Sequence, residues 1–152
     1  MTPCADGDDG MVFRATRMDE LAALAAFIGR ACARAGADAG AAADLRLAAE
    51  EVFTNIMRHG YGGRPGPVTV QVQVAPGRMV LSLADAAPDF DPAGVAAPET
   101  GSALEQREPG GLGWHLVRRV MDEVKREPGP GGGNVFTLVK ELPAGRQAGS
   151  DE

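Results

Sequence analysis

The stretch Ala49-Glu-Glu-Val-Phe-Thr-Asn-Ile-Met-Arg-His-Gly-Tyr61 contains the pattern that decides the fold. Glu51, Asn55 and His59 are spaced four residues apart, so they lie on one face of an α-helix. The apolar residues of this region also repeat at helical spacing, on the neighbouring face: Leu45, Ala49, Val52 and Ile56. The region therefore predicts a helix with a polar row at the edge of the core.

The polar row suggests a chemistry for this helix. A carboxylate, an amide oxygen and an imidazole on one face can serve a metal ion and phosphate groups. The oxygen of an Asn side chain is a suitable hard ligand for Mg²⁺, which takes other oxygens from substrate phosphates and water. Because Glu-x-x-x-Asn also occurs in many helices that carry no site, a solvated polar face is the alternative interpretation.

Segments outside this helix predict an α+β domain. Asp38 can cap the central helix, which reaches His59 and stops at Gly60, and a preceding helix runs from Asp19 to Gly36. Residues 68–74 alternate valine with polar residues and are joined by a tight turn to a second apolar run at 79–84, which predicts a β-hairpin and excludes a βαβ unit. The remaining expected elements are a strand at 11–16, a helix from Gly113 that includes Val124, a loop at 128–133 and a strand at 135–142.

Residues 86–111 show no sustained periodicity and are rich in Pro, Gly, Ala and acidic residues. Long irregular segments inside compact domains are usually functional lids or disordered. This one lies between a strand end and a glycine-rich helix start, which favours a lid. We expect a single domain at 11–143, with a flexible N-terminus at 1–10 and a flexible tail at 144–152.

Composition excludes several function classes. The 152 residues carry a formal net charge of −6, which disfavours direct binding of nucleic acid because phosphates need basic patches. No stretch approaches the roughly 20 apolar residues that span a bilayer, and the acidic start of the chain does not resemble a secretory signal. Of the two cysteines, Cys32 lies in an apolar helical stretch, so a buried reduced thiol and a cytoplasmic location are expected.

Asp85 is placed where the second strand of the hairpin ends. A carboxylate in this position can accept a hydrogen bond from an exocyclic amino group such as that of adenine. An Asp that only stabilises a turn is the alternative interpretation.

The sequence Gly110-Gly-Leu-Gly113 leads directly into a helix. Glycines allow a ligand to approach the backbone closely, and a helix N-terminus offers free N–H groups and a positive dipole to a phosphate. A flexible loop-to-helix junction is the alternative. The motif matches neither a Walker A loop nor a Gly-x-Gly-x-x-Gly dinucleotide loop.

In this order, these motifs resemble the GHKL ATPase superfamily with its Bergerat ATP-binding fold, and in particular the bacterial anti-sigma-factor serine/threonine kinases. The resemblance covers roughly residues 12–142 and is carried by residues 49–61, 85–92, 110–124 and 133–138. It implies a two-layer α/β sandwich whose mixed, mostly antiparallel sheet has helices packed on one face. It also implies ATP and Mg²⁺ as cofactors.

The resemblance implies a role for individual residues. Glu51 would be the catalytic base, Asn55 would hold Mg²⁺, and Asp85 would bind the adenine amino group. His59 would lie near the phosphates, and Arg107 in the lid would neutralise charge on the transferred group. The phosphates would be bound by Gly110, Gly111, Leu112 and Gly113.

Two further positions concern the adenine pocket. Ala87 stands where the family usually has a glycine close to adenine, which predicts a narrower pocket and weaker binding. Thr137 in the last strand is a candidate for a contact with adenine.

The functional hypothesis is a cytoplasmic kinase that phosphorylates a STAS-type anti-sigma antagonist, sequesters a sigma factor and forms a homodimer. The alternative is a nucleotide-gated binding module that sequesters a partner without kinase activity. A histidine-kinase catalytic fragment is less favoured, because no dimerisation helix with a phosphoacceptor histidine precedes the domain. An unrelated α/β domain requires that the four motifs align by chance.

Overall fold

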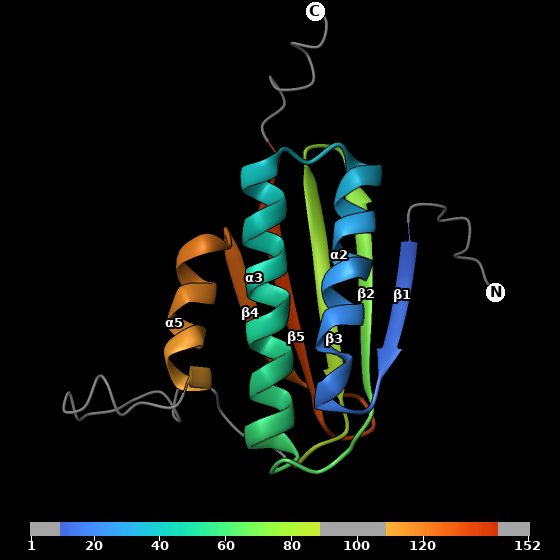
Figure 1. Ribbon diagram of the computed structural model, residues 1–152, viewed down its shortest axis with the longest axis vertical. Coiled ribbons are helices and arrows are strands. Elements are labelled where there is room, and N and C mark those ends of the chain that lie inside the picture. The colour runs from blue at the N-terminus through green and yellow to red at the C-terminus, as the bar shows by residue number, and fades with distance from the viewer. Residues whose placement is uncertain (1–9, 89–108, 143–152) are drawn as a thin grey trace, which may run out of the picture.

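The computed structural model describes residues 10–88 and 109–142, which form a two-layer α+β sandwich (Figure 1). One layer is a sheet of five strands in the order β1-β2-β3-β5-β4. The strands are β1 (Gly10–Ala15), β2 (Val68–Ala75), β3 (Arg78–Asp85), β4 (Glu123–Pro128) and β5 (Asn134–Glu141).

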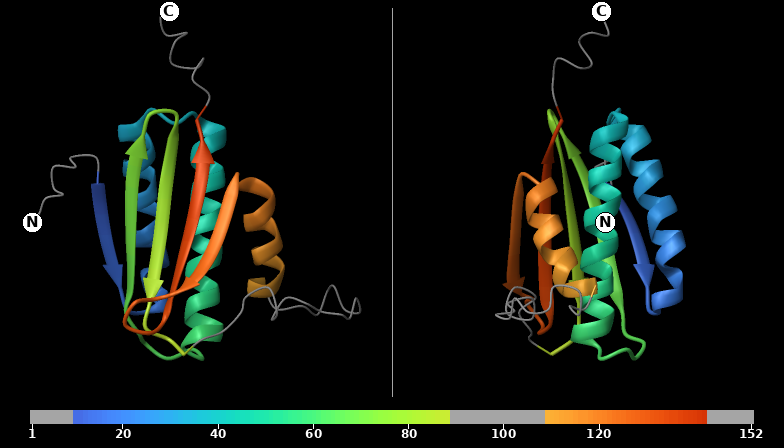
Figure 2. Two further views of the ribbon diagram at one scale, coloured as in Figure 1. Left: turned by 180° about the vertical axis from the view of Figure 1, so that it is seen from behind. Right: turned by 60° about the vertical axis from the view of Figure 1, so that its left-hand side comes forward.

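The described helices cover one face of this sheet, and none of them lies on the opposite face (Figure 2). They are α2 (Leu21–Ala35), α3 (Ala39–Asn55) and α5 (Pro109–Val120), and the short 3₁₀-helix η1 (Met18–Glu20) precedes α2. The predicted sandwich with helices on one face is confirmed. All neighbouring pairs among the five strands are antiparallel, so the described sheet is not mixed.

The ends of the first two helices follow from local chemistry. Helix α2 ends at Gly36, whose φ of 72° is left-handed and costs a glycine little. Helix α3 begins after Asp38, whose side chain accepts a hydrogen bond from the backbone N–H of Ala41 at 2.8 Å. Both predicted boundaries are confirmed.

The last turn of the central helix differs from the regular helix that the sequence predicts. After Asn55 the chain forms a π-helical turn, η2 (Ile56–Gly60), and the N–H of Tyr61 donates to the carbonyl oxygen of Ile56 at 2.9 Å. A π-turn contains more residues per hydrogen-bonded ring than an α-turn and is frequent at functional sites. His59 therefore departs from the α-helical row that Glu51 and Asn55 share.

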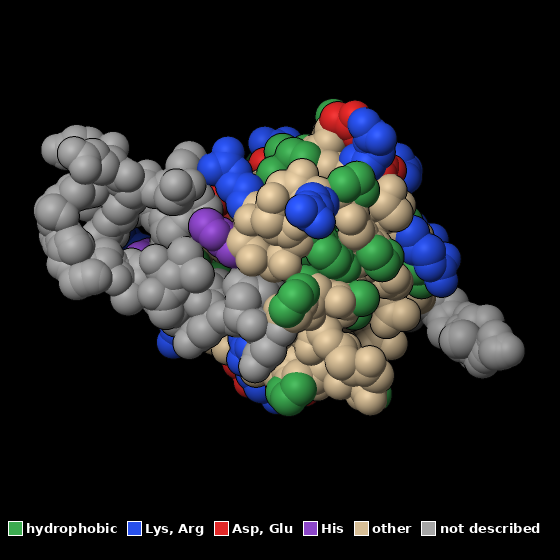
Figure 3. All heavy atoms as spheres, turned by 90° about the horizontal axis from the view of Figure 1, so that it is seen from below, with side chains coloured by type: hydrophobic (Ala, Val, Ile, Leu, Met, Phe, Trp, Pro, Cys, Tyr) green, Lys and Arg blue, Asp and Glu red, His purple; other side chains and the backbone are tan. Residues whose placement is uncertain are grey.

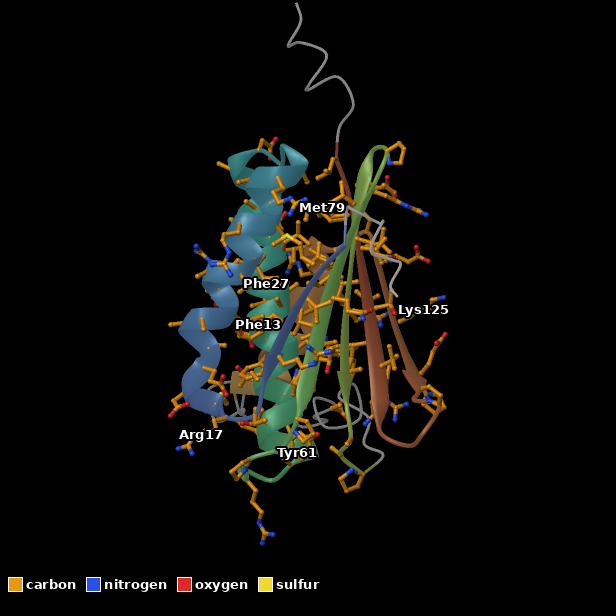
Figure 4. The ribbon with its side chains drawn as sticks, turned by 90° about the vertical axis from the view of Figure 1, so that its right-hand side faces the viewer. Phe13, Arg17, Phe27, Tyr61, Met79 and Lys125 are labelled. Atoms are coloured by element: carbon orange, nitrogen blue, oxygen red, sulfur yellow. The ribbon has the colours of Figure 1, made fainter. Side chains whose placement is uncertain are left out.

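The core lies between the two layers. Its largest fully buried side chains come from the inner faces of the helices and from alternate positions of the strands: Leu24, Ile28, Leu45, Phe53, Ile56, Leu81, Leu83, Phe136 and Leu138. Each such Leu, Ile or Phe stabilises the fold by about 1.5–3 kcal/mol relative to an exposed position. The rings of Phe13 and Phe27, 5.4 Å apart, attach β1 to α2 (Figure 4).

The segment after α5 corrects the predicted helix that includes Val124. Helix α5 ends at Val120, and Glu123–Pro128 forms the edge strand β4. The physical reason is an alternation of half-buried Val124 and Arg126 with exposed charged residues, and charged residues are typical of edge strands. The end of α5 is held by Lys140, whose Nζ donates at 2.8 Å to the carbonyl oxygen of Val120.

Two composition-based expectations can be compared with the described residues. Cys32 is buried, as predicted, and burial raises the pKa of its thiol. None of the described helices combines the length and the apolar character that a membrane span requires.

Candidate active site

Three segments that are far apart in the sequence end at the same side of the molecule. The C-terminal end of α3, the C-terminal end of β3 and the N-terminal end of α5 all lie at the lower end in Figures 1 and 2. The edge-to-face contact between the rings of Trp114 and Phe136, 6.0 Å between centroids, attaches α5 to β5. The fold therefore brings the three predicted motifs to one region.

Asn55 is the most unusual residue of this region. Asn55 is only 1% exposed, and within the described part of the chain neither its Oδ1 nor its Nδ2 has a hydrogen-bond partner. Each buried polar group without a partner costs about 1–3 kcal/mol, so such a group in a native protein indicates strain, a catalytic role, or a bound water or ion. The described residues contain no group of three His, Cys, Asp or Glu that could hold a metal ion. A cation bound at Asn55 would therefore need oxygens from its own ligand, which fits Mg²⁺ on phosphates.

Glu51 lies one turn before Asn55 on α3 and is half-buried. Burial raises the pKa of its carboxyl group, the neighbouring charge of Glu50 raises this pKa further, and Arg58 opposes the shift. A carboxylate with a raised pKa is a better proton acceptor, which is the property of a general base.

His59 lies in the π-turn, and its Nε2 is buried and without a hydrogen-bond partner. It lines an open pocket of about 510 Å³ together with Tyr61, Arg64 and Pro88. The predicted position of His59 near the phosphates stays a prediction.

Asp85 ends β3 with its two carboxylate oxygens in different environments. Oδ1 accepts hydrogen bonds from the N–H of Ala87 at 2.9 Å and from the N–H and Nδ2 of Asn134 at 3.1 and 3.2 Å. Oδ2 is buried and has no partner in residues 10–88 and 109–142. Burial raises the pKa of Asp85, and the hydrogen bonds from Ala87 and Asn134 oppose the shift. One oxygen thus fixes the side chain, and the other is available to a donor on a ligand.

Asn134 is a candidate site residue that the sequence interpretation missed. It is fully buried at the start of β5, and its Oδ1 has no hydrogen-bond partner among the residues that the structure describes. With Oδ2 of Asp85 it offers a second buried acceptor, a combination suited to an amino group with two hydrogens. The alternation of side chains along β5 could have indicated this residue, because Asn134 lies two and four residues before Phe136 and Leu138, which face the helices.

The same alternation along β5 shows that the predicted contact of Thr137 with adenine, beside Asp85, is wrong. Thr137 alternates with buried Phe136 and Leu138, so it lies on the sheet face that no helix covers. Asp85 has the opposite orientation, alternating with the half-buried Ala84. Thr137 therefore does not join Asp85.

Ala87 shows that the turn after Asp85 accepts a side chain. It is 1% exposed, and its backbone N–H donates to Asp85 Oδ1. The effect of its methyl group on nucleotide affinity stays a prediction.

The glycine-rich motif lies in the helix rather than in a loop before it. Helix α5 begins at Pro109, four residues before the predicted start, because proline is favoured in the first helical turn. Gly110, Gly111, Leu112 and Gly113 form the beginning of the helix. The first N–H groups of a helix have no partner within it and can bind an anion. Arg107 and most of the predicted lid, residues 89–108, lie outside the described residues, as do 1–9 and 143–152.

Tyr61 is a second residue that the sequence interpretation did not assign to the site. Its hydroxyl group donates to the carbonyl oxygen of Pro67 at 2.7 Å and accepts from the N–H of Ala86 at 2.8 Å. Its ring packs so closely on Gly66 that a Cβ at this position would meet the ring. Tyr61, at the lower end in Figure 4, therefore connects the loop after α3 to the residue that follows Asp85.

Comparison with known proteins agrees with this geometry. A family model described as "Histidine kinase-like ATPase domain" matches residues 14–140. The chain belongs to this ATPase-domain family.

Individual relatives of this ATPase domain include bacterial regulators. It is 25% identical over 100 residues to an "Anti-sigma F factor" of Thermoanaerobacter sp., with 66% of this chain and 70% of the relative covered. It is 31% identical over 97 residues to a "Serine-protein kinase RsbW" of Listeria innocua, with 60% of this chain and 62% of the relative covered.

Solved structures show the same fold. The RsbU and RsbW domains of Rv1364c from Mycobacterium tuberculosis align with a TM-score of 0.63 at 20% identity, covering 93% of this chain and 33% of that chain. The SiaB-SiaC complex from Pseudomonas aeruginosa aligns with a TM-score of 0.53 at 18% identity, covering 87% and 89%.

Replacement of Asp85 in the ATPase domain tests its assignment to adenine. In Asp85→Asn, the oxygen of the new amide can still accept from the N–H and Nδ2 of Asn134. Its NH₂ group would then face the ligand and could not accept a hydrogen bond from the adenine amino group. Because a hydrogen bond to a charged group contributes about 1.5–3 kcal/mol, we expect ATP affinity to fall about 10- to 100-fold. Tripolyphosphate, which lacks adenine, should bind as before in isothermal titration calorimetry. Equal losses for both ligands would show that Asp85 does not recognise the base.

Tyr61→Phe tests whether the hydrogen bond from Tyr61 to the residue after Asp85 matters for nucleotide binding. The phenylalanine ring can still pack on Gly66, but the N–H of Ala86 loses its acceptor. We expect ATP affinity to fall about 3- to 10-fold, the effect of one neutral hydrogen bond of about 0.5–1.5 kcal/mol. Titration with ATP and with tripolyphosphate measures the effect. An unchanged ATP affinity would show that Tyr61 only stabilises the loop.

Proposed function

We propose that the chain is an ATP-dependent serine/threonine protein kinase of the anti-sigma-factor type, which phosphorylates a STAS-domain antagonist and sequesters a sigma factor. The observation that carries the proposal is the buried Asn55 amide without partners, at the end of the molecule where Asp85 and the start of α5 also lie. The names "Anti-sigma F factor" and "Serine-protein kinase RsbW" among the relatives support this choice within the ATPase family.

Adenine fits the buried acceptors of the site better than guanine does. Oδ2 of Asp85 and Oδ1 of Asn134 both need a donor. The amino group of adenine supplies two hydrogens, whereas guanine carries a carbonyl oxygen at the corresponding ring position. ATP is therefore the expected nucleotide, with its phosphates toward the first turn of α5.

Phosphoryl transfer requires mainly positioning and charge stabilisation from the protein. Glu51 accepts the proton of the substrate hydroxyl as the hydroxyl oxygen forms a bond to the γ-phosphorus and the bond to the β–γ bridging oxygen breaks. ADP is the leaving group. Asn55 would hold Mg²⁺, which neutralises phosphate charge when bound, and its unpartnered Oδ1 fits this role. Arg107 is proposed to neutralise charge on the transferred group.

The product explains how partners would be exchanged. A phosphate adds about −1.5 to −2 charges to the antagonist, which disrupts a docked interface by repulsion and desolvation. The antagonist would then leave, and the sigma factor would bind in its place. We also propose a homodimer in the cytoplasm.

Transfer of label from γ-³²P-ATP tests the proposal. The full chain is incubated with ATP, Mg²⁺ and a STAS-domain protein of the same organism. We expect label on a serine or threonine of the STAS protein. The alternative, a nucleotide-gated module that only sequesters its partner, predicts nucleotide-dependent binding of the STAS protein without label.

A further inference from the structure

A second open pocket, of about 530 Å³, lies outside the proposed nucleotide site. It is formed where the start of α2 meets the turn after α3. Its lining includes Arg17, Arg58, Arg64, Asp19, Met18 and Met57. We call it the arginine pocket.

The charge of this pocket contrasts with that of the chain. Among the described residues that line it there are three arginines and one acid, whereas the whole chain has a formal net charge of −6. Asp19, the acid among the described lining residues, lies 3.5 Å from Arg17 in an exposed ion pair, and such pairs contribute little in water. A local excess of positive charge on an acidic protein attracts acidic ligands and repels positively charged ones.

The pocket also has an apolar component. Met57 is 2% exposed and belongs to the core cluster, and Met18 packs against that cluster. Figure 3, which views this end from below, shows Lys and Arg side chains next to exposed hydrophobic ones. Methionine adapts to different partner shapes, so the lining suits a protein segment that carries acids and an apolar anchor.

The position of the arginine pocket relates it to the nucleotide side. Arg64 and Pro65 line both this pocket and the one that contains His59, Tyr61 and Pro88. Arg17 and Tyr61 lie at the same end of the molecule in Figure 4. A protein bound in the arginine pocket would therefore be close to the proposed phosphates.

We propose that the arginine pocket docks an acidic segment of the partner protein. Its carboxylates pair with Arg17 and Arg64, and an apolar side chain contacts the half-buried Met18. The proposal deepens the proposed function, because it names the chemistry by which a protein substrate or partner is held beside the nucleotide.

Fluorescence anisotropy without nucleotide tests the docking separately from ATP binding. The probe is a fluorescein-labelled peptide with the sequence Asp-Asp-Leu repeated four times, and its control replaces each Asp with Asn. We expect saturable binding of the acidic peptide by the full chain, with binding of the control weaker by about tenfold or more. Arg17→Glu and Arg64→Glu should each lower the affinity for the acidic peptide by about tenfold or more.

Arg34→Glu is the matched control, because it changes the net charge equally at the exposed far end of α2. Its affinity for the acidic peptide should stay within about twofold of the wild-type value, since interactions between exposed charges more than about 10 Å apart are screened at 0.1 M salt. Three results would overturn the proposal: no binding by the wild type, equal losses in all three variants, or displacement of the peptide by tripolyphosphate at equal concentration. The last would indicate a simple anion site. Arg17 lines the arginine pocket but not the pocket that contains His59. Measuring the ATP affinity of Arg17→Glu therefore shows separately whether the nucleotide site is intact.

Discussion

Glu51→Gln is expected to bind ATP with Mg²⁺ normally and to lose about 100- to 10,000-fold of the rate of phosphoryl transfer, the usual contribution of a general base. The amide has nearly the shape of the carboxylate but cannot accept the proton of the substrate hydroxyl. Single-turnover label transfer to the STAS protein measures the rate, and calorimetric titration measures nucleotide affinity. Full kinase activity in this variant would remove Glu51 from the chemistry.

Glu50→Gln is the matched control. Glu50 is the adjacent acid, and it lies 3.9 Å from Arg46 in an ion pair on the surface of α3. This variant should keep the transfer rate at neutral pH. A loss as large as that of Glu51→Gln would show that the effect comes from charge in general.

The pH dependence of the transfer rate follows from the raised pKa of Glu51. The base acts only when deprotonated, so the rate should fall as the pH falls through this raised pKa, at a higher pH than an exposed glutamate would require. Glu50→Gln removes one cause of the shift and should move the midpoint to lower pH. A midpoint that does not respond to Glu50 would contradict this assignment.

Stability separates the chemical effect from unfolding. Because the folded state raises the pKa of Glu51, it binds the proton more tightly than the unfolded chain does. This group therefore lowers stability as the pH rises from its unfolded pKa through its folded pKa. Glu51→Gln lacks that loss, so its free energy of unfolding at pH 7 should not be lower than that of the wild type.

Asn55→Ala is expected to reduce Mg²⁺-dependent ATP affinity by about 100-fold, because a buried polar contact to a charged ligand contributes about 1.5–3 kcal/mol. Its effect on stability should have the opposite sign. The wild type buries two amide atoms without partners, and alanine removes both of them. Thermal unfolding without ligand should therefore show a midpoint equal to or above that of the wild type.

Thr54→Ala is the control for this variant, since Thr54 is the preceding residue of α3 and points to a different side of the helix. Its ATP affinity should remain within about twofold of the wild type. We expect the wild type to bind ATP more tightly with Mg²⁺ than with a chelator. Equal ATP affinity of Asn55→Ala under the two conditions would show that this variant has lost a metal ligand. Unchanged affinity in Asn55→Ala would remove this residue from the metal site.

Much of the fold follows from local patterns in the sequence. The alternating valines of β2 and the tight turn before β3 predict a hairpin, and Gly36 and Asp38 mark the helix boundaries. The edge strand β4 could not be recognised in this way. Val124 extends the helical spacing of α5 by coincidence, and only the pairing of β4 with β5 shows its true conformation.

The candidate site residues that local sequence patterns indicate share one element or mark the end of one. Glu51 and Asn55 are one helical turn apart, and Asp85 marks a strand end. Asn134 and Tyr61 act through hydrogen bonds to residues 49 and 25 positions away in the sequence. The alternation of β5 indicates that Asn134 faces the helices, but no local pattern reports that it contacts Asp85 or that Tyr61 contacts Ala86.

The most direct test of the account is calorimetric titration of the folded full chain with ATP, once with Mg²⁺ and once with a chelator. The account predicts one saturable site per chain whose affinity falls when the metal is removed. No binding of ATP by the folded protein at millimolar concentration would contradict it.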